Sequence, residues 1–313
     1  MDTQLFEFKR NMLLSILILV FSGIILFTAY KMNIEPYRLM ITEKEILSDN
    51  LTDKLQGLRI AHLADFHFDK NHGKHIIDFF DLMHDRKIDL IFLTGDFVET
   101  KGGLDNLVKV LKKIETLEPR YGIYGCLGNH DYFHFSRKDF ILVRYVVDEK
   151  NDIDELTKTL KENGIELLLN ENRVIDINGE KVNIVGIDEY VSGRFSLPAA
   201  MDGLDPNRFT ILISHAPDIV FHLEPYKVDL VLSGHTHGGQ IKLPFWGTVI
   251  KRTKLKRKQS SGLFRYNGTN VHITQGLGAS PKAMVRFLCS PEIAMLTLNK
   301  KSKIMELPFM VTA

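Results

Sequence analysis

Residues 58–67 read LRIAHLADFH, an apolar run that ends at two side chains able to bind a metal ion. The run from Leu58 to Ala64 is rich in apolar residues and has the length of a buried strand. Asp65 and His67 follow it directly. Active sites of α/β proteins lie beyond the carboxyl ends of strands. The segment therefore predicts a sheet with a site at its edge.

The same pattern recurs four more times along the chain. Strands are predicted at Asp89–Thr94, Gly122–Leu127, Phe209–Ile213 and Val228–Ser233, and they are followed in turn by Gly95-Asp96, Gly128-Asn129-His130-Asp131, Ser214-His215 and Gly234-His235-Thr236-His237-Gly238-Gly239. Further strands are predicted at Val182–Ile187, Asn270–Thr274 and Glu292–Leu298, and helices at Lys74–Arg86, Leu104–Leu117 and Ile153–Asn163. This alternation predicts one α/β domain over residues 58–313.

The N-terminal part of the chain has a different composition. Residues 12–30 contain no charged side chain and are dominated by Leu, Ile, Val and Phe. A helix of this length spans roughly 28 Å, close to the hydrocarbon thickness of a bilayer. The alternatives are a buried core helix and a cleaved signal peptide, although Thr28-Ala29-Tyr30 is a poor cleavage site. We therefore expect a tail over 1–11, a single-pass membrane anchor over 12–30 and a connector over 31–57. Basic residues flank both ends of the anchor, so its orientation stays open.

Composition restricts the chemistry of the rest. The 313 residues carry a formal net charge of +1 and 44% hydrophobic side chains, which is typical of a globular protein and argues against a dedicated nucleic-acid binder. Cys126 and Cys289 are the only cysteines. They supply neither a disulfide framework nor a thiolate metal site, so histidine and oxygen ligands must hold any metal. The oligomeric state is not encoded in these patterns.

Imidazole, carboxylate and amide ligands suit divalent ions such as manganese, iron or zinc. Two such ions about 3.5–4 Å apart can hold both the attacking and the leaving oxygen of an in-line displacement. A carboxylate is the natural bridge between them, and Asp96 is the candidate. Each motif alone is weak, since Gly-Asp after a strand is usually only a turn. Five in order, each behind a predicted strand, predict a two-metal hydrolase.

With these motifs in this order, the chain resembles the calcineurin-like metallophosphoesterase superfamily over residues 58–298. The resemblance implies a four-layer α-β-β-α sandwich. It also implies two divalent ions, with Mn²⁺ the first choice and iron or Zn²⁺ the alternatives. One ion would bind Asp65, His67, Asp96 and His237, and the other Asp96, Asn129, His215 and His235. His130 would donate to a phosphate oxygen or to the leaving group, and Asp131 would orient it.

A narrower resemblance concerns the membrane. The anchor, the run Asn33–Tyr37 and the tail motifs Gly262–Arg265, Gly276–Gly278 and Pro291–Ile293 are similar to a membrane-associated bacterial phosphodiesterase branch. That branch implies a bacterial inner-membrane enzyme with a lipid-linked substrate, such as UDP-2,3-diacylglucosamine with release of UMP. Gln275 stands where an arginine is expected in the tail, and the stretch 132–151 is longer than expected.

Two further segments bear on the substrate. The stretch 132–151 mixes aromatic and basic residues, which predicts either an amphipathic flap that contacts lipid or an extra helix packed on the domain. Residues 251–258 hold six basic side chains in eight positions. Such a run can attract anionic lipid, steer a polyanionic substrate or form a solvated loop.

We therefore expect a membrane-anchored phosphoesterase that acts on a lipid-linked phosphodiester or pyrophosphate. The alternatives are a general phospholipid or cell-envelope phosphodiesterase, a nuclease and a non-catalytic scaffold. A scaffold predicts that some of the ligand residues have been lost, and the sequence retains all of them.

Overall fold

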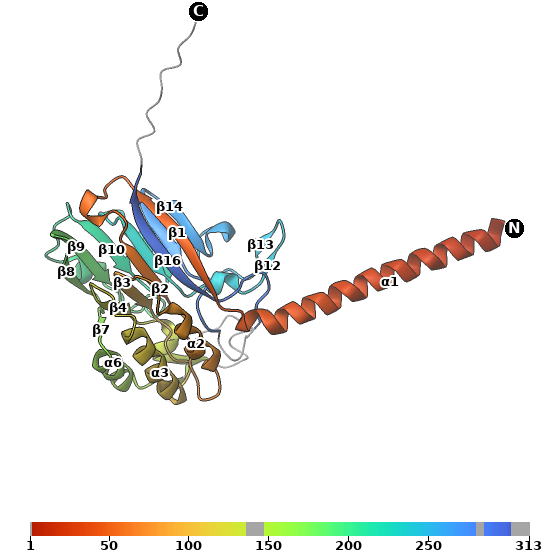
Figure 1. Ribbon diagram of the computed structural model, residues 1–313, viewed down its shortest axis with the longest axis horizontal. Coiled ribbons are helices and arrows are strands. Elements are labelled where there is room, and N and C mark those ends of the chain that lie inside the picture. Colours follow the sequence, from red (N-terminus) through yellow and green to blue (C-terminus); the bar gives the residue numbers. More distant parts are fainter. Residues whose placement is uncertain (1, 136–146, 280–284, 302–313) are drawn as a thin grey trace, which may run out of the picture.

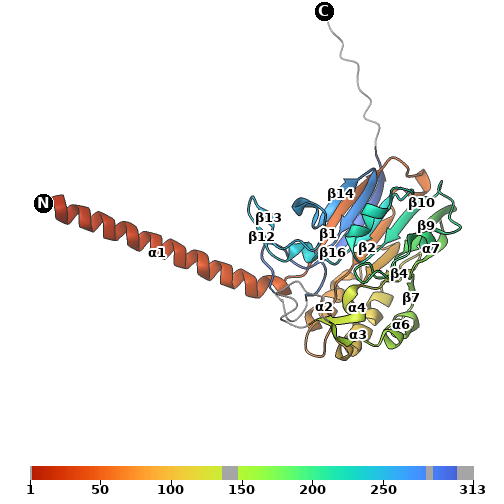
Figure 2. The same cartoon turned by 180° about the vertical axis from the view of Figure 1, so that it is seen from behind.

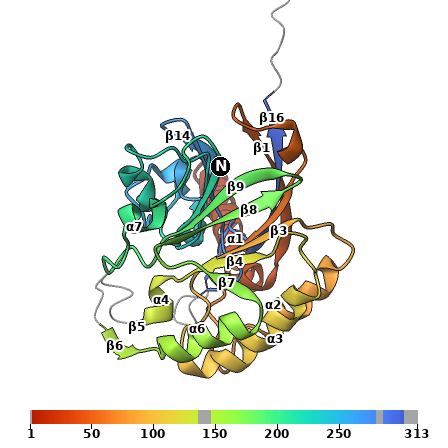
Figure 3. The same cartoon turned by 90° about the vertical axis from the view of Figure 1, so that its left-hand side faces the viewer.

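The computed structural model describes residues 2–135, 147–279 and 285–301. Two six-stranded sheets face each other, helices lie on the outer face of each sheet, and one long helix leaves the body on one side (Figure 1). Seen along that helix, the layers of the sandwich are separated (Figure 3). The expected four-layer α-β-β-α sandwich is confirmed.

The first sheet carries the strand that the opening motif predicts. Its strand order is β1 (Met40–Ser48), β16 (Glu292–Lys300), β2 (Arg59–Leu63), β3 (Leu90–Thr94), β4 (Ile123–Cys126) and β7 (Ile165–Leu167). Strands β2, β3, β4 and β7 are parallel, whereas β16 runs antiparallel to β2, and β1 runs parallel to β16. The start of β1 therefore lies at the edge where β2, β3 and β4 end.

The second sheet is also mostly parallel. Its strand order is β14 (Gly262–Tyr266), β15 (Thr269–Ile273), β11 (Leu230–Ser233), β10 (Phe209–Ile213), β9 (Glu180–Gly186) and β8 (Glu171–Ile177). The four central strands are parallel, and the two edge strands are antiparallel to their neighbours. Both sheets thus present several carboxyl ends of parallel strands.

Three apolar clusters hold the layers together. Phe92, Ile184 and Leu232 belong to the cluster between the two sheets. A second cluster lies between the first sheet and its helices, and a third covers the outer face of the second sheet. The helices on the first sheet are α2 (Lys74–Phe79), α3 (Leu104–Glu115) and α6 (Ile153–Glu162); those on the second are α7 (Leu197–Met201) and the 3-10 helix η5 (Pro217–His222).

Shorter elements complete the described chain. They are α4 (Asn129–Tyr132), the hairpin strands β5 (Phe133–Phe135), β6 (Val147–Lys150), β12 (Lys242–Leu243) and β13 (Gly247–Thr248), and the 3-10 turns at Glu35–Tyr37, Asp53–Leu55, Phe80–Met83, Lys101–Gly103, His237–Gly239 and Arg257–Gln259. The middle of the 132–151 stretch lies outside the described residues.

Helix α1 (Asp2–Ile34) contains the predicted anchor. It is long and apolar enough to cross a membrane, and none of its most apolar window is buried against the domain. An apolar helix of this length that packs on nothing exposes about five turns of Leu, Ile and Phe to its surroundings. The fold therefore includes a candidate membrane-spanning helix.

Two of the predicted segments differ from the structure. The helix expected over Lys74–Arg86 ends earlier, at Phe79, and continues as the 3-10 turn Phe80–Met83. The stretch expected as a connector contains β1, which pairs along its whole length with β16. As an edge strand β1 is largely solvated, with only Ile46 and Ser48 buried, so its charged residues resemble those of a linker.

Candidate metal centre

The predicted ligands gather where the carboxyl ends of both sheets meet. Asp65 and His67 follow β2, Asp96 follows β3, and His235 and His237 follow β11. All five adopt left-handed backbone conformations, with φ between 48° and 69°. Such residues cost of order 1–3 kcal/mol each, and they persist where the surrounding structure forces them, typically at functional sites. The backbone is thus bent to aim these side chains inward.

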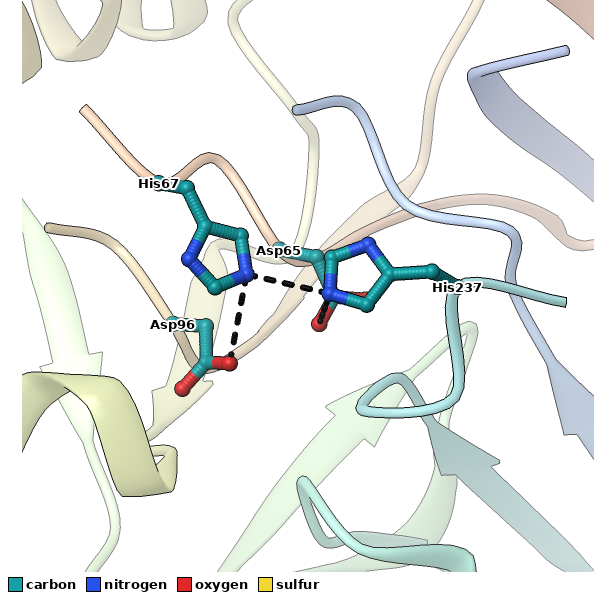
Figure 4. Close-up of side chains that lie close together, drawn as sticks. All are labelled: Asp65, His67, Asp96 and His237. Atoms are coloured by element: carbon teal, nitrogen blue, oxygen red, sulfur yellow. Dashed lines mark hydrogen bonds and ion pairs between the residues drawn. The ribbon is translucent and has the colours of Figure 1, made fainter. Parts of the chain in front are cut away.

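A first cluster joins Asp65, His67, Asp96 and His237, all buried and within 4.8 Å of one another (Figure 4). His67 Nε2 lies 3.1 Å from His237 Nε2 and 3.4 Å from Asp96 Oδ2. His237 Nε2 is 3.5 Å from Asp65 Oδ1. These are the four residues expected around one ion.

A second cluster adjoins it through Asp96. His215 Nε2 lies 3.1 Å from the same Oδ2 atom of Asp96 that faces His67. His235 Nδ1 is 3.3 Å from His215 Nε2 and 2.9 Å from Asn129 Oδ1. The structure thus brings the second expected set together and places Asp96 between the two.

The distances fit cation binding. Two atoms that bind one ion at about 2.0–2.2 Å are themselves roughly 3.0–3.5 Å apart. The measured separations, from 2.9 to 3.5 Å, fall on or next to that range. Asp65 Oδ2 is buried without a hydrogen-bond partner among the described residues. A buried carboxylate oxygen without a partner is costly unless a cation or proton compensates it.

The imidazole orientations fit as well. His67 Nδ1 lies 2.9 Å from Glu99 Oε2, and His215 Nδ1 donates to the Thr94 carbonyl at 2.7 Å. In each ring the outer nitrogen is held by an oxygen, and Nε2 is directed into the cluster. Metal-binding histidines are commonly fixed in this way by an acceptor on the other nitrogen.

Protonation follows from burial and charge. Burial, reinforced by neighbouring positive groups that include Arg252, lowers the pKa of His235 and His237 well below the usual value. These rings are therefore neutral and can bind a metal. Burial alone would raise the pKa of Asp96, but His215 and His130 outweigh it and lower that pKa strongly. Burial alone would lower the pKa of His215, but the Asp96 carboxylate outweighs it and raises that pKa to about 10. The carboxylates of the site thus stabilise positively charged groups placed beside them.

Sequence reasoning missed Glu99, which is buried beside the first cluster. Its Oε2 atom lies 3.0 Å from His130 Nδ1 and 2.9 Å from His67 Nδ1. One carboxylate therefore contacts both a candidate metal ligand and the candidate proton donor. The available signal was an acidic residue three positions after Asp96, in a loop already identified as part of the site.

Asp131 has partners different from those expected. Its carboxylate accepts hydrogen bonds from the backbone N–H groups of Asp96, Phe97, Val98 and Gly128, at 2.7–3.2 Å. The His130 ring contacts Glu99 through its Nδ1 atom, at 3.0 Å from Oε2. Asp131 therefore fixes the two loops that carry Asp96 and Asn129, while Glu99 lies where an orienting group is needed.

Glycines allow these loops to approach each other. A Cβ at Gly128 would lie 2.3 Å from Asp96 Oδ1, and one at Gly234 would lie 2.7 Å from Asp65 Oδ2. Neither contact is sterically possible. The glycines beside the ligands are thus required by the close approach of the loops.

The C-terminal tail supports the histidine loop. Cys289 Sγ donates to the His237 carbonyl and to Gln275 Oε1, at 3.2 and 3.0 Å. The arginine expected at Gln275 is absent, but Arg286 is fully buried and donates to the carbonyls of residues 275, 276, 278 and 289. Because its guanidinium donates to these backbone carbonyls, Arg286 stabilises the C-terminal tail at residues 275–278 and 289.

The fold and this buried cluster of histidines and carboxylates define a metal-dependent phosphoesterase. Residues 58–239 match the family model described as calcineurin-like phosphoesterase, and the chain belongs to that family. It is therefore a metal-dependent hydrolase, and the family implies divalent metal ions at its site. The matched range contains all nine predicted site residues.

Several bacterial proteins are similar over most of the chain. The metallophosphoesterase YkoQ of Bacillus subtilis is 32% identical, covering 86% of this chain and 92% of that protein. The phosphodiesterase YaeI of Escherichia coli is 31% identical, covering 79% and 84%. The UDP-2,3-diacylglucosamine pyrophosphatase LpxG of Chlamydia trachomatis is 27% identical, covering 84% and 90%.

Proposed function

We propose that this chain is a membrane-anchored two-metal phosphoesterase that hydrolyses a phosphodiester or pyrophosphate bond of a lipid-linked substrate. The observation that carries the proposal is the position of the anchor. Strand β1 begins at the edge where β2, β3 and β4 end, so α1 leaves the domain beside the ligand loops. A reactive phosphate in a lipid head group is therefore close to the metal centre.

A chain of contacts supports this placement. Glu35, just after α1, accepts hydrogen bonds from Cys289 N and Ser290 Oγ, both at 3.0 Å. Cys289 in turn donates to the His237 carbonyl. The end of the candidate anchor is thus connected to the candidate metal ligand His237 through the contacts of only two residues, Glu35 and Cys289.

The ligand assignment follows the two clusters. Asp65, His67, Asp96 and His237 would hold one ion, Asp96, Asn129, His215 and His235 the other, and Asp96 would bridge them. Mn²⁺ is the proposed metal, since mixed imidazole, carboxylate and amide ligands suit it. When bound, two such ions lower the pKa of water and withdraw negative charge from the phosphate oxygens.

His130 is proposed to act on the leaving group. Burial lowers its pKa, but Glu99 and Asp96 outweigh that effect and raise it above the usual value. A raised pKa favours the protonated ring, which is the form that can donate to the departing oxygen. Arg252, from the basic run 251–258, adds positive charge near His130, His235 and His237. This charge favours an anionic substrate.

The proposed substrate is UDP-2,3-diacylglucosamine, with release of UMP, at a bacterial inner membrane. The similarity to LpxG along 84% of the chain supports this choice. A phospholipid or cell-envelope phosphodiester is the second candidate, supported by the similarity to the phosphodiesterase YaeI. A nuclease and a non-catalytic scaffold have no such support.

The test uses detergent-purified, manganese-loaded protein and measures UMP release from UDP-2,3-diacylglucosamine. We expect release that is absent in Asp96→Asn. Hydrolysis of bis-p-nitrophenyl phosphate without UMP release would retain the phosphoesterase and replace the substrate by another envelope phosphodiester. His130→Ala is expected to lower kcat by about 10²–10⁴-fold, the usual contribution of a general acid, with little change in metal content.

A further inference from the structure

We propose that the β12–β13 hairpin is a second membrane contact beside α1. Its tip, Leu243–Trp246, would insert into the lipid surface, and the basic run 251–258 would lie against anionic head groups. The inference rests on the proposed membrane location of α1, and it adds a surface that would orient the metal centre toward the bilayer.

The tip of the hairpin exposes large apolar side chains. Phe245 is 110% exposed, Trp246 67% and Leu243 45%, relative to a free residue. Val249 and Ile250, just after β13, extend the same exposed apolar stretch. Exposed apolar clusters of this kind mark interaction surfaces, because isolated apolar residues are common but contiguous ones are not.

The backbone holds the Phe245 side chain outward. Phe245 has a φ of 66°, in the left-handed region that bulky residues rarely adopt. Leu243 pairs with Gly247 across the hairpin, and Trp246 N donates to the Pro244 carbonyl at 2.8 Å. A strained, tightly closed turn that projects a phenyl ring into solvent is a feature to explain by function.

The hairpin is fixed to the metal centre. Thr248 Oγ1 donates to the Gly238 carbonyl, next to His237, and a Cβ at Gly239 would lie 2.0 Å from Thr248 Cγ2. Arg257 donates to the carbonyls of Thr248 and Val249, and its guanidinium lies 5.9 Å from the Trp246 ring centre. The tip is therefore held at a defined position relative to the ligands.

The hairpin and α1 lie on the same side of the domain. Lys242 N donates to the Phe287 carbonyl and Phe287 N to the Gln240 carbonyl, both at 2.9 Å. Two residues later, Cys289 contacts Glu35 at the end of α1. Figures 1 and 2 show the hairpin above the root of α1, on the side from which the helix leaves. A bilayer crossed by α1 would thus pass close to the tip.

Charge favours a lipid surface over a protein partner. Lys251, Lys254, Lys256 and Lys258 are exposed, and none forms an ion pair within the described part of the chain. Aromatic side chains beside Lys and Arg are the composition typical of membrane interfaces. Each basic residue near an anionic leaflet adds to the attraction.

Trp246 is the only tryptophan, so intrinsic tryptophan fluorescence reports on the tip alone. The experiment reconstitutes the full chain in vesicles of equimolar phosphatidylcholine and phosphatidylglycerol, with or without lipids spin-labelled on the acyl chain. We expect the emission to shift to shorter wavelength and to lose most of its intensity with spin-labelled lipid. Phe245→Asp is expected to reduce both effects.

A matched control moves the tryptophan to the end of the first sheet that lies opposite the ligand loops. Tyr121 precedes β4, at the end of the sheet opposite the ligand loops. The double variant Trp246→Phe, Tyr121→Trp should reconstitute equally well and show no quenching by spin-labelled lipid. Quenching of this control to the same extent would overturn the proposal.

Flotation separates failure of the anchor from failure of the hairpin. If the chain does not float with the vesicles, the membrane proposal for α1 fails. If the chain floats but Trp246 stays accessible to aqueous quencher and insensitive to spin-labelled lipid, only the hairpin proposal fails. A blue shift without lipid quenching would mean that protein, such as a second copy, covers the tip. Equal quenching in phosphatidylcholine alone would overturn the role given to the basic run.

Discussion

Replacing Glu99 with glutamine removes one negative charge from between two imidazoles of the site. The carboxylate is buried, and its Oε2 atom lies 3.0 Å from His130 Nδ1 and 2.9 Å from His67 Nδ1. Glutamine has nearly the same volume and keeps one acceptor oxygen. The change therefore tests the charge of residue 99 and leaves the packing in place.

The magnitude follows from the type of hydrogen bond that is lost. A hydrogen bond to a charged group contributes about 1.5–3 kcal/mol and a neutral one about 1 kcal/mol, so the loss is roughly 0.5–2 kcal/mol. If this loss falls on the transition state, kcat drops about 2- to 30-fold.

The sign of the pH effect is determined by the active form of His130. As a proton donor it acts when protonated, so activity is lost as pH rises through its pKa. Glu99 raises that pKa, and the glutamine variant lowers it. The alkaline limb of the kcat profile should therefore move to lower pH.

The assay is hydrolysis of bis-p-nitrophenyl phosphate across pH, with metal content measured in parallel. Glu189→Gln is the matched control, since Glu189 is equally buried but accepts from Val191 N and Ser192 N, both at 2.6 Å. We expect the control to lose stability and keep its pH profile. An unchanged alkaline limb in Glu99→Gln, with metal content intact, would refute the role given to Glu99.

Three changes to the chain and one change of metal content test the site and the anchor. Asp96→Asn should abolish diester hydrolysis because it removes the bridging charge; a normal rate would exclude the shared-ligand arrangement. Gly128→Ala should lower metal content and turnover, since its Cβ would lie 2.3 Å from Asp96 Oδ1, whereas a Cβ at Gly102 meets no atom closer than 3.4 Å, so Gly102→Ala should leave both unchanged. Deleting residues 1–30 should give a detergent-free protein with full diester activity, because α1 buries no core; loss of the thermal transition would contradict this. Chelation should lower Tm, and Mn²⁺ at 100 times its Kd should restore about 2.7 kcal/mol of stability, measured by thermal unfolding.

The ligand loops were predictable because each follows a buried strand. Parallel strands bring their carboxyl ends to one edge, so residues as distant in sequence as Asp65 and His237 are expected together once the strands are recognised. The candidate membrane helix was predictable from length and the absence of charge. The family resemblance was legible from the same motifs, and the match over residues 58–239 confirms it.

The contacts of Glu99 and Asp131 were not predictable from the sequence. Asp131 lies in a site motif and Glu99 lies three residues after Asp96, so either carboxylate is a candidate to contact His130. Which carboxylate faces the His130 ring depends on how two loops pack, and only the structure places Glu99 there. The role of β1 was hidden for a related reason. Its sequence is polar because an edge strand has a solvated face, and its partner β16 lies at the other end of the chain.

The sequence by itself thus determined the chemistry of the site: which residue types are present, behind which strands, and with an apolar segment ahead of them. Only the tertiary structure decided that this apolar helix emerges next to the ligand loops, because the pairing of β1 with β16 brings Glu35 against Cys289 and Cys289 against His237. Contacts between residues so far apart along the chain arise from strand pairing and sheet packing, which no local pattern encodes.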